Sequence, residues 1–249
     1  MAGHSHWARI KRKKGATDAR RGRLWSKLAR AVIVAARIGG GDPEQNLSLR
    51  YAIDKAKQAN MPKDTIENAI KKGTGEAGGG NFETLYYEGY GPGGVAMLCE
   101  ALTDNRNRTA PEVKKIFERH GGNTGASGCV QWMFSSKGQI TVAVSAADED
   151  QIAEIALEAG ADDYQQSDDV WEITCEPSAF EPIREALAEA DIETQSAELS
   201  MVPASTITVS PEDGRKILKL VEELEDHDDI QNVYSNFDIP DEVMASMEE

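Results

Sequence analysis

The sequence of 249 residues contains few of the side chains that build disulfide frameworks, metal sites and nucleophilic centres. Its three cysteines, Cys99, Cys129 and Cys175, are scattered without CxxC spacing. A low, odd number of cysteines excludes a disulfide framework and favours a reducing compartment such as the cytoplasm. Each cysteine lies in an apolar, strand-like run, so we expect buried thiols rather than ligands or nucleophiles.

Histidines and long apolar runs are also scarce. Among the four histidines, His4 and His6 have no third ligand nearby in the sequence, and no Ser/His/Asp or Cys/His constellation is visible. We therefore expect no catalytic residues, no metal and no cofactor. No apolar run reaches the roughly 18 residues that a membrane-spanning helix needs, and the basic N-terminus lacks the apolar segment of a secretory signal. These features predict a cytoplasmic protein without membrane contact.

Positive charge is scarce over most of the chain and concentrated at its N-terminal end. Residues 1–76 hold 17 basic and 7 acidic side chains, whereas residues 77–249 hold 10 basic and 36 acidic ones. A cationic segment on an acidic chain favours contact with nucleic acid, because neutralising phosphates releases condensed counterions. The predicted nucleic-acid-binding residues are Arg9, Lys11, Arg12, Lys13, Lys14, Arg20, Arg21, Arg23, Lys27 and Arg30.

The cationic run at residues 11–14 lies close to Trp7, whose ring can stack on a base or ribose. The alternative interpretation, a merely solubilising tail, does not explain positive charge on a chain of net charge −16. No homeodomain, zinc-finger or RNP pattern is present, so the sequence predicts phosphate contact and not base-specific reading. DNA and ribosomal RNA remain equal candidates.

Residues 1–78 have helical periodicity. We expect a first helix from Thr17 or Asp18 to the glycines at 39–41, with Leu24, Leu28 and Val32 in its core stripe. A second helix is expected to start at Asp42 and Pro43 with Gln45 completing a capping box. A third is expected to open at Pro62 and end at Gly73, before a glycine-rich linker.

Strands and helices alternate after residue 80. Residues 139–199 read strand, helix, strand, strand, helix, strand, which is a ferredoxin-like unit. The flanking run 94–134 has strands expected at 94–102 and 129–134 around a helix at 110–120, and the run 206–237 has strands expected at 206–209 and 230–237 around a helix at 211–225. Together they predict a second such unit. The predicted fold is therefore α+β and multidomain: an all-helical N-terminal domain followed by two ferredoxin-like α/β domains, one inserted in the other. The expected boundaries are 1–78 for the helical domain with its basic arm, 79–137 plus 204–238 for the split domain, 138–203 for the inserted domain and 239–249 for an acidic tail.

The loop from Thr103 to Thr109 is a second candidate site. Arg106 and Arg108 precede an expected capping box at Thr109–Glu112, where free backbone N–H groups favour a phosphate or carboxylate. The alternative is that both arginines pair with nearby acids, and the sequence does not decide between these interpretations. The glycines of residues 89–94 lack the Lys-Ser/Thr of a P-loop, so we expect a hairpin turn there.

Several long motifs in a fixed order resemble the YebC/PmpR family, which includes a mitochondrial translational activator. The motifs are Met1-Ala2-Gly3-His4-Ser5, Gly39-Gly40-Gly41-Asp42-Pro43, Ala59-Asn60-Met61-Pro62-Lys63-Asp64, Ile70-Lys71-Lys72-Gly73-Thr74-Gly75, Tyr87-Glu88-Gly89-Tyr90-Gly91-Pro92-Gly93-Gly94 and Leu102-Thr103-Asp104-Asn105-Arg106-Asn107-Arg108-Thr109. Residues 46–50 depart from the family, which more often has a proline and an extra basic residue there. The resemblance covers essentially the whole chain. It implies a helical domain, two α/β domains and a cytoplasmic regulator of gene expression that acts through DNA or on the ribosome.

The leading hypothesis is thus a non-enzymatic nucleic-acid-binding regulator of transcription or translation. Its expected partner is DNA or ribosomal RNA, and binding of ribosomal RNA would place it on the ribosome. One alternative is a small-molecule or nucleotide-dependent enzyme that uses an interdomain cleft, with Arg106 and Arg108 as anion ligands. The other is a protein-interaction module whose basic arm binds an acidic protein.

Overall fold

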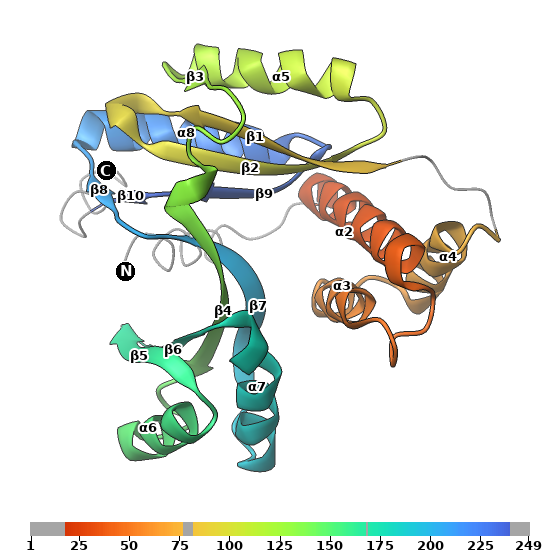
Figure 1. Cartoon of the computed structure of the whole chain (residues 1–249), viewed down its shortest axis with the longest axis vertical. Coiled ribbons are helices and arrows are strands. Elements are labelled where there is room, and N and C mark those ends of the chain that lie inside the picture. The colour runs from red at the N-terminus through yellow and green to blue at the C-terminus, as the bar shows by residue number, and fades with distance from the viewer. Residues whose placement is uncertain (1–17, 77–81, 168, 240–249) are drawn as a thin grey trace. The chain divides into compact units, whose positions relative to one another are not determined.

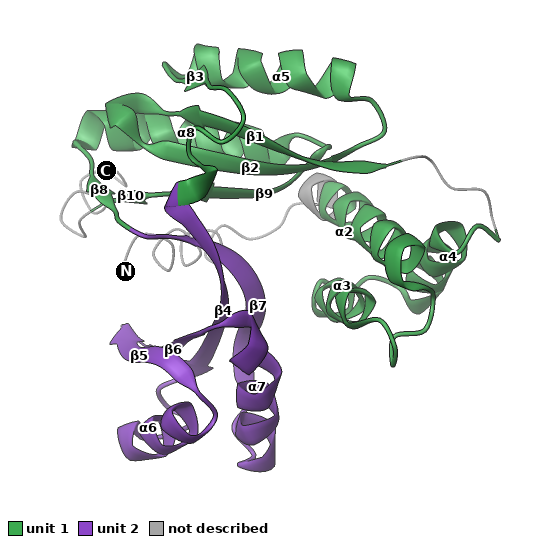
Figure 2. Cartoon of the chain, viewed as in Figure 1, with its two compact units in different colours: residues 1–132, 205–249 green, residues 133–204 purple. Residues whose placement is uncertain are grey.

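The computed structural model describes residues 18–76, 82–167 and 169–239, with the side chains of residues 18–21 excepted. The chain forms two compact units, one of residues 1–132 with 205–249 and one of residues 133–204 (Figure 2). This division groups the N-terminal helices with the α/β region that follows them. The predicted boundaries of three domains therefore stay a prediction, and residues 240–249 of the predicted tail lie outside the described residues.

Between Asp18 and Glu76 the structure describes three helices: α2 (Asp18–Gly39), α3 (Leu47–Gln58) and α4 (Lys63–Gly73) (Figure 1). Each helix contributes apolar side chains to one shared core. The buried members are Val32, Ile33, Ala36, Leu49, Ile53, Ala56, Met61, Ile66 and Ala69. Val32 lies in this core as predicted, but Leu24 is 44% exposed, so the stripe expected on α2 is rotated toward Ile33 and Ala36.

Helix α3 begins later than predicted. The Asp42 carboxylate accepts the N–H of Glu44 at 3.0 Å and its backbone carbonyl accepts the N–H of Gln45 at 3.2 Å, so Asp42 lies within a turn. The N-cap is Asn46, whose side-chain oxygen accepts the N–H of Leu49 at 3.1 Å. The Asn46 amide also donates to the carbonyls of Ala35 and Gly40, both at 2.8 Å. These bonds tie the start of α3 to the end of α2, which explains why Asn46 rather than Asp42 sets the boundary.

Helices α2 and α4 approach closely at Gly73. A Cβ atom at this position would lie 2.5 Å from the carbonyl oxygen of Ile33 and 2.6 Å from the Cβ of Ala36. Both distances are shorter than a van der Waals contact. The absence of a side chain at Gly73 therefore permits the packing of these two helices.

The first unit also contains a four-stranded antiparallel sheet, with the order β3-β1-β2-β9. The strands are β1 (Glu83–Tyr90), β2 (Ala96–Thr103), β3 (Asn123–Thr124) and β9 (Ile230–Ser235). The short 3₁₀ helix η1 (Pro92–Gly94) closes the β1–β2 hairpin, and Gly93 and Gly94 have φ of 69° and 76°. The predicted hairpin turn is thereby confirmed, since positive φ favours glycine.

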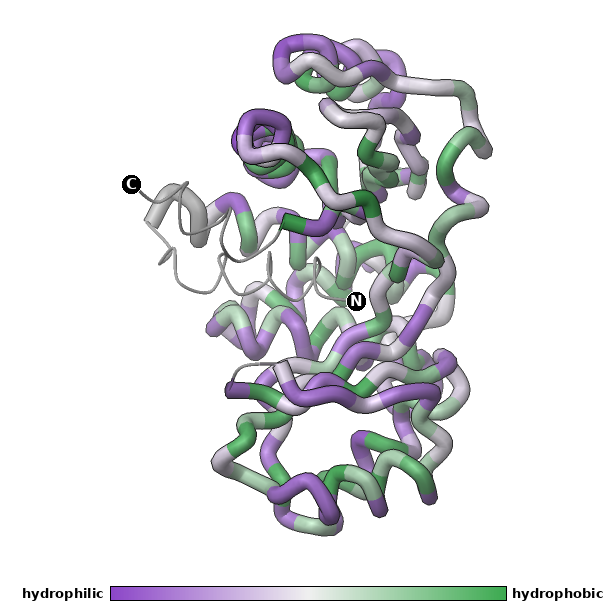
Figure 3. The backbone as a smooth tube through the Cα atoms, turned by 90° about the vertical axis from the view of Figure 1, so that its left-hand side faces the viewer, coloured by the Kyte–Doolittle hydropathy of each residue, from purple (hydrophilic) through white to green (hydrophobic). Residues whose placement is uncertain are grey.

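Two helices, α5 (Arg106–Arg119) and α8 (Pro211–Asp226), cover one face of this sheet. The buried side chains between them include Met97, Cys99, Val113, Phe117, Ile217, Leu220, Leu224 and Val233. Figure 3 shows hydrophilic and hydrophobic residues interspersed along the helices and strands. Such interspersion is what amphipathic elements with one buried face require.

The strand expected at residues 129–134 is wrong. This segment holds the 3₁₀ helix η2 (Gln131–Met133), and Phe134 begins a strand of the second unit. The buried carboxylate of Glu88 accepts the backbone N–H groups of Gly128, Val130 and Gln131, at 2.5, 2.7 and 2.8 Å. The segment therefore curls around a carboxylate instead of satisfying its N–H groups in a β-ladder.

The strand expected at residues 206–209 exists but does not join the main sheet. It is β8 (Ile207–Thr208), which pairs in parallel with β10 (Phe237–Asp238) in a separate two-stranded sheet. Asn236 causes the change, because its side chain accepts the Ala96 N–H at 2.8 Å and its carbonyl accepts the Ile207 N–H at 2.8 Å. The chain thus leaves the β2 ladder at Asn236.

The second unit has the predicted order of elements and a four-stranded antiparallel sheet, β5-β6-β4-β7. Its elements are β4 (Phe134–Ala143), α6 (Glu149–Glu158), β5 (Ala161–Ser167), β6 (Val170–Cys175), η3 (Pro177–Ala179), α7 (Phe180–Glu189) and β7 (Thr194–Pro203). Its first and last strands form the central pair β4–β7. The predicted class, a helical N-terminal region followed by α/β sheets in a multidomain α+β protein, is confirmed.

Candidate nucleic-acid interface

Most of the predicted nucleic-acid-binding residues cannot be placed. Five precede the described residues: Arg9, Lys11, Arg12, Lys13 and Lys14. Two lie on α2 at positions whose side chains are not described: Arg20 and Arg21. Their role in binding stays a prediction, and of the ten residues the structure describes the side chains of Arg23, Lys27 and Arg30.

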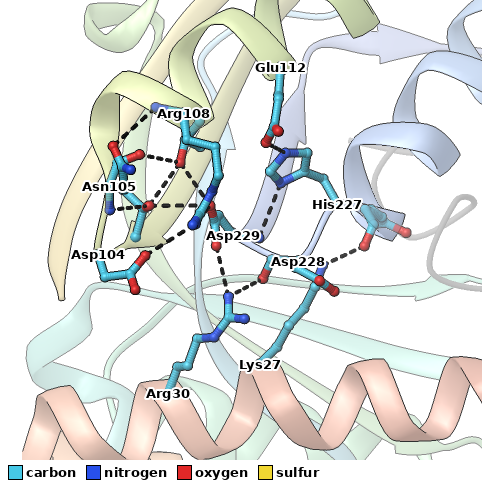
Figure 4. A network of polar contacts seen from close by, with 12 residues as sticks. Lys27, Arg30, Asp104, Asn105, Arg108, Glu112, His227, Asp228 and Asp229 are labelled. Carbon is cyan, nitrogen blue, oxygen red and sulfur yellow. Dashed lines mark hydrogen bonds and ion pairs between the residues drawn. The ribbon is translucent and has the colours of Figure 1, made fainter. Parts of the chain in front are cut away.

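These three residues contact an acidic segment, residues 225–229, where α8 ends (Figure 4). Lys27 is buried, and its Nζ donates to the carbonyl oxygen of Glu225 at 2.5 Å. Arg30 Nη1 donates to the carbonyl oxygen of Asp228 at 2.7 Å and to Asp229 Oδ1 at 3.0 Å. Arg23 lies 3.6 Å from the Asp226 carboxylate. Part of the basic face of α2 is therefore engaged by oxygen atoms of the chain itself.

Asp229 lies at the centre of this network and is 4% exposed. Its Oδ2 accepts from Arg108 at 2.6 Å, from the Thr109 hydroxyl at 2.8 Å and from the Thr103 hydroxyl at 3.2 Å. Burial raises the pKa of Asp229. The hydrogen bonds from Arg108 and Thr109 and the positive charges of Arg108 and Arg30 outweigh it, and together they hold this pKa below its ordinary value. The buried carboxylate is thus ionised and paired.

Helix α5 begins at Arg106, four residues before the predicted start. Asn105 is the N-cap, and its side-chain oxygen accepts the N–H of Arg108 at 3.2 Å. The predicted cap, Thr109, instead uses its hydroxyl for the buried bonds to Thr103 and Asp229. The expected capping box at Thr109 is therefore wrong, because a tertiary contact takes the hydroxyl.

The two arginines of the candidate anion loop have different surroundings. Arg108 pairs with Asp104 at 3.2 Å and with Asp229, and the hydrogen bond and charge of Asp229 raise the pKa of Arg108. Arg106 is exposed, and no hydrogen bond or ion pair joins it to the described residues. Anion binding by both arginines stays a prediction.

A hollow of about 720 Å³ opens beside this network. Its basic lining residues are Arg23, Arg30, Arg108, Lys115 and Arg119. Its other charged or titratable residues are Glu112, Asp226, His227, Asp228 and Asp229. Arg119 and His120 both contact the carboxylate of Glu223, while His227 Nε2 lies 3.1 Å from Glu112. The hollow is polar and of mixed charge, which suits phosphate or carboxylate groups better than apolar ligands.

Four lysines of the helical region keep exposed ammonium groups and were missed as candidates. Lys57 and Lys63 lie 3.8 and 3.7 Å from exposed acids on their own helices. Lys71 and Lys72 are exposed in the last turn of α4. The sequence signal was present, because these lysines contribute to the basic excess of residues 1–76, although Lys71 and Lys72 also complement the dipole at the C-terminal end of α4.

The remaining reactive groups are not arranged as a catalytic or metal centre. Cys99 and Cys175 are buried as predicted, and burial raises the pKa of their thiols to about 12 and about 11, whereas Cys129 is half-buried. Within residues 18–76, 82–167 and 169–239 no cluster of three or more His, Cys, Asp or Glu side chains could hold a metal ion. In the same ranges, each helix is too short or too polar to cross a membrane.

Comparison with known proteins identifies the chain over nearly its whole length. The family described as the TACO1/YebC protein N-terminal domain matches residues 5–76, and the family described as the TACO1/YebC second and third domain matches residues 82–237. A relative from Dictyoglomus turgidum is 52% identical over 99% of this chain and 100% of its own length. A relative from Natranaerobius thermophilus is 53% identical over the same shares. Both are named "probable transcriptional regulatory protein".

A solved structure supports the same assignment. The crystal structure of a conserved hypothetical protein from Aquifex aeolicus has a TM-score of 0.85 to this fold at 48% sequence identity. The match covers 95% of this chain and 98% of that one. Together with the two family matches, these likenesses lead to one conclusion: the chain belongs to the TACO1/YebC family.

Proposed function

We propose that this protein is a non-enzymatic, cytoplasmic regulator of gene expression that binds nucleic acid through its N-terminal helical region. The observation that carries the proposal is the separation of charge, since residues 1–76 hold 17 of the 27 basic side chains. The relatives' printed name, probable transcriptional regulatory protein, supports a role in regulation. The unpaired cysteines support a reducing compartment.

The surroundings of α2 support contact with phosphates in particular. Lys27 and Arg30 already donate to carbonyl and carboxylate oxygens, so their geometry suits oxygen acceptors. The exposed lysines at positions 57, 63, 71 and 72 add cations on the same helical region. In this proposal the residues before α2 supply further phosphate contacts, while the docked cations hold the helical region against residues 225–229.

Two targets fit this chemistry: DNA, as in regulation of transcription, and ribosomal RNA, as in regulation of translation on the ribosome. Contacts to phosphates position a protein on either polymer without reading its sequence. Crosslinking the protein to nucleic acid in cells and sequencing the attached fragments separates the two. Enrichment of ribosomal RNA supports action on the ribosome, and enrichment of promoter DNA supports action on transcription.

The decisive experiment replaces residues 11–14 by alanine and measures affinity for DNA and RNA oligonucleotides over a range of salt concentrations. Each lost phosphate contact lowers the log–log salt slope by about 0.7–0.9, so the variant is expected to bind more weakly and with a flatter slope. A matched control removes four exposed basic residues from α5 and α8 that do not line the hollow beside Asp229, and it is expected to keep the slope. Its substitutions are Lys114→Ala, Arg215→Ala, Lys216→Ala and Lys219→Ala. Unchanged, salt-insensitive binding by the residue 11–14 variant contradicts the proposal.

A further inference from the structure

The edge of β1 is incompletely paired. Strand β3 pairs with β1 only at Gly89 and Tyr90. The N–H of Gly125 donates to the carbonyl of Glu88 at 2.8 Å, after which the chain leaves the edge. The backbone groups of Glu88 therefore point outward from the β1–β2 pair, and those of Tyr86 and Thr84 point the same way because strand residues alternate. Within the described part of the chain no strand pairs with these outward groups.

The other edges of the two four-stranded sheets are protected and this one is not. The opposite edge strand of the first sheet, β9, is mostly buried. In the second unit, β5 has a register irregularity beside Asp162 and Asp163. Strand β7 has an irregular register near Thr194 and contains the exposed Glu198. Bulges and charges of this kind discourage strand addition. The β1–β2 register is continuous and residues 84–87 carry no charge, so an added strand meets no such obstacle.

A groove follows the unpaired edge. It has a volume of about 430 Å³, with Tyr86 and Tyr87 of β1 on one side and Ala110, Pro111 and Lys114 of α5 on the other. The open edge from residue 83 to residue 87 is about 17 Å long at the rise of a β-strand, which accommodates a segment of about five residues. The hydroxyl of Tyr87 is buried without a hydrogen-bond partner among the described residues. An unpartnered buried hydroxyl beside a groove marks a place where a ligand can complete the bonding.

The charges along the groove select the ligand. Lys114 is 61% exposed and has only Glu118 as a partner, at 3.8 Å. Burial raises the pKa of Tyr87; among the charges that act on this hydroxyl, Arg106 has the largest effect and lowers the pKa, while Asp229 and Glu83 raise it. The one carboxylate that lines the groove, Glu88, is already satisfied by three backbone N–H groups. The groove therefore presents cations to a bound chain, and it complements acidic side chains.

We propose that the free edge of β1 binds an extended acidic peptide of a partner protein, which adds to the sheet as a strand beside Thr84 and Tyr86. Backbone hydrogen bonds to those two residues supply the affinity, as in other β-augmentation complexes. The groove between β1 and α5 takes the side chains on one face of the peptide, and Lys114 pairs with an acid among them. This binding site is separate from the proposed phosphate contacts of the helical region.

The test uses a phage-displayed library of random twelve-residue peptides selected on the full chain. The most enriched peptide is synthesised with a fluorescent label, and its affinity is measured by anisotropy. Thr84→Pro removes the outward N–H without breaking a ladder bond, which edge strands tolerate. Thr84→Val is the matched control, because it keeps the N–H and the side-chain shape. Ala110→Trp fills the groove from the helix without adding a charge and leaves the strand unchanged.

We expect enriched peptides to be acidic, Thr84→Pro and Ala110→Trp to weaken binding by at least about tenfold, and Thr84→Val to stay within about twofold. If Thr84→Pro fails to fold, the Ala110→Trp comparison decides alone. Absence of enriched peptides, or equal binding by all folded variants, overturns the proposal. So does a concentration-dependent dimer that Thr84→Pro abolishes, since a second copy then occupies the edge. Loss of oligonucleotide binding in Thr84→Pro equally overturns it, because the edge is then part of the nucleic-acid surface.

Discussion

Replacing Asp229 by asparagine removes the negative charge at the centre of the polar network in Figure 4 and keeps the shape of the side chain. The carboxylate accepts one hydrogen bond at Oδ1, from Arg30, and three at Oδ2, from Arg108, Thr103 and Thr109. The asparagine amide offers one acceptor oxygen and turns an NH₂ donor toward the other donors. The change therefore weakens the charge-assisted hydrogen bonds from Arg30 and Arg108. It also makes the new NH₂ group face another hydrogen-bond donor.

The expected cost follows from these bonds. A hydrogen bond to a charged group contributes about 1.5–3 kcal/mol, but Arg30 and Arg108 are 22% and 45% exposed, so solvent screens them and the lower end applies. Retention of one acceptor oxygen offsets part of the loss. We expect Asp229→Asn to lower the free energy of unfolding of the first unit by about 2–3 kcal/mol.

The pH dependence gives a second readout. Because the pKa of Asp229 is held below its ordinary 3.8 in the folded protein, its contribution is fully present above the unfolded pKa and is lost as pH falls through the folded pKa. The stability difference between wild type and Asp229→Asn should therefore be constant near pH 7 and shrink below about pH 4. Urea unfolding measures this difference, and amide hydrogen exchange over residues 96–119 locates it in the first unit.

The neighbouring Asp228 is the control. It is exposed, and it contacts Arg30 through its backbone carbonyl, which Asp228→Asn keeps. We expect that control to change stability by less than about 0.5 kcal/mol. Equal effects of the two substitutions, or a difference that does not change with pH, would refute the view that a paired, buried carboxylate holds α5, β9 and α2 together.

Two further predictions concern other packing features. Glu88→Gln should destabilise the first unit by about 2–3 kcal/mol, because the glutamine loses the charge that three backbone N–H groups contact. Burial raises the pKa of Glu88, but those three hydrogen bonds outweigh it and lower the pKa. The stability difference between wild type and Glu88→Gln, measured by urea unfolding, should therefore shrink as pH drops below about 4.5. A difference that grows in acid contradicts this. Gly73→Ala should destabilise the helical region by about 1–3 kcal/mol by overpacking against Ile33 and Ala36. A Cβ atom at Gly22 on α2 would have no heavy atom within 4 Å, so Gly22→Ala should instead stabilise the helical region by about 0.5–1 kcal/mol. Thermal unfolding measures both glycine variants, and a higher stability of Gly73→Ala than of Gly22→Ala contradicts the packing argument.

The class of fold was predictable because the hydrophobic periodicity of helices and strands and the caps of helices depend on residues that are close in the sequence. Ser210 caps α8 by accepting the Asp213 N–H at 3.2 Å, and the predicted turn at residues 89–94 needed only its glycines. The errors have tertiary causes. Asn46 sets the start of α3 through bonds to α2, and Glu88 bends residues 128–131 through contacts across about 40 positions in the chain. Such partners are distant in the sequence and leave no periodic signal.

In the candidate site, too, local features were predictable from the sequence and tertiary contacts were not. The excess of basic residues was visible, but charge alone does not reveal that Lys27 and Arg30 contact residues about 198 positions away. The composition of the acidic run at the end of α8 is typical of a solvated surface, yet Asp229 is buried. Complementary charge runs at distant positions were the only sequence sign of this contact.

The way the second unit joins the first affects the order of folding. Its entry and exit residues, Phe134 and Pro203, are ladder partners, so the folded insert presents its two ends side by side. An unfolded insert would be a loop of roughly 70 residues that the first unit must close, whereas a folded insert is equivalent to a tight turn. The entropic cost of closing the loop is on the order of 2 kcal/mol higher with an unfolded insert than with a folded one. Folding of the insert thus brings residues 132 and 205 together in advance, and it lowers the entropic barrier to pairing β2 with β9.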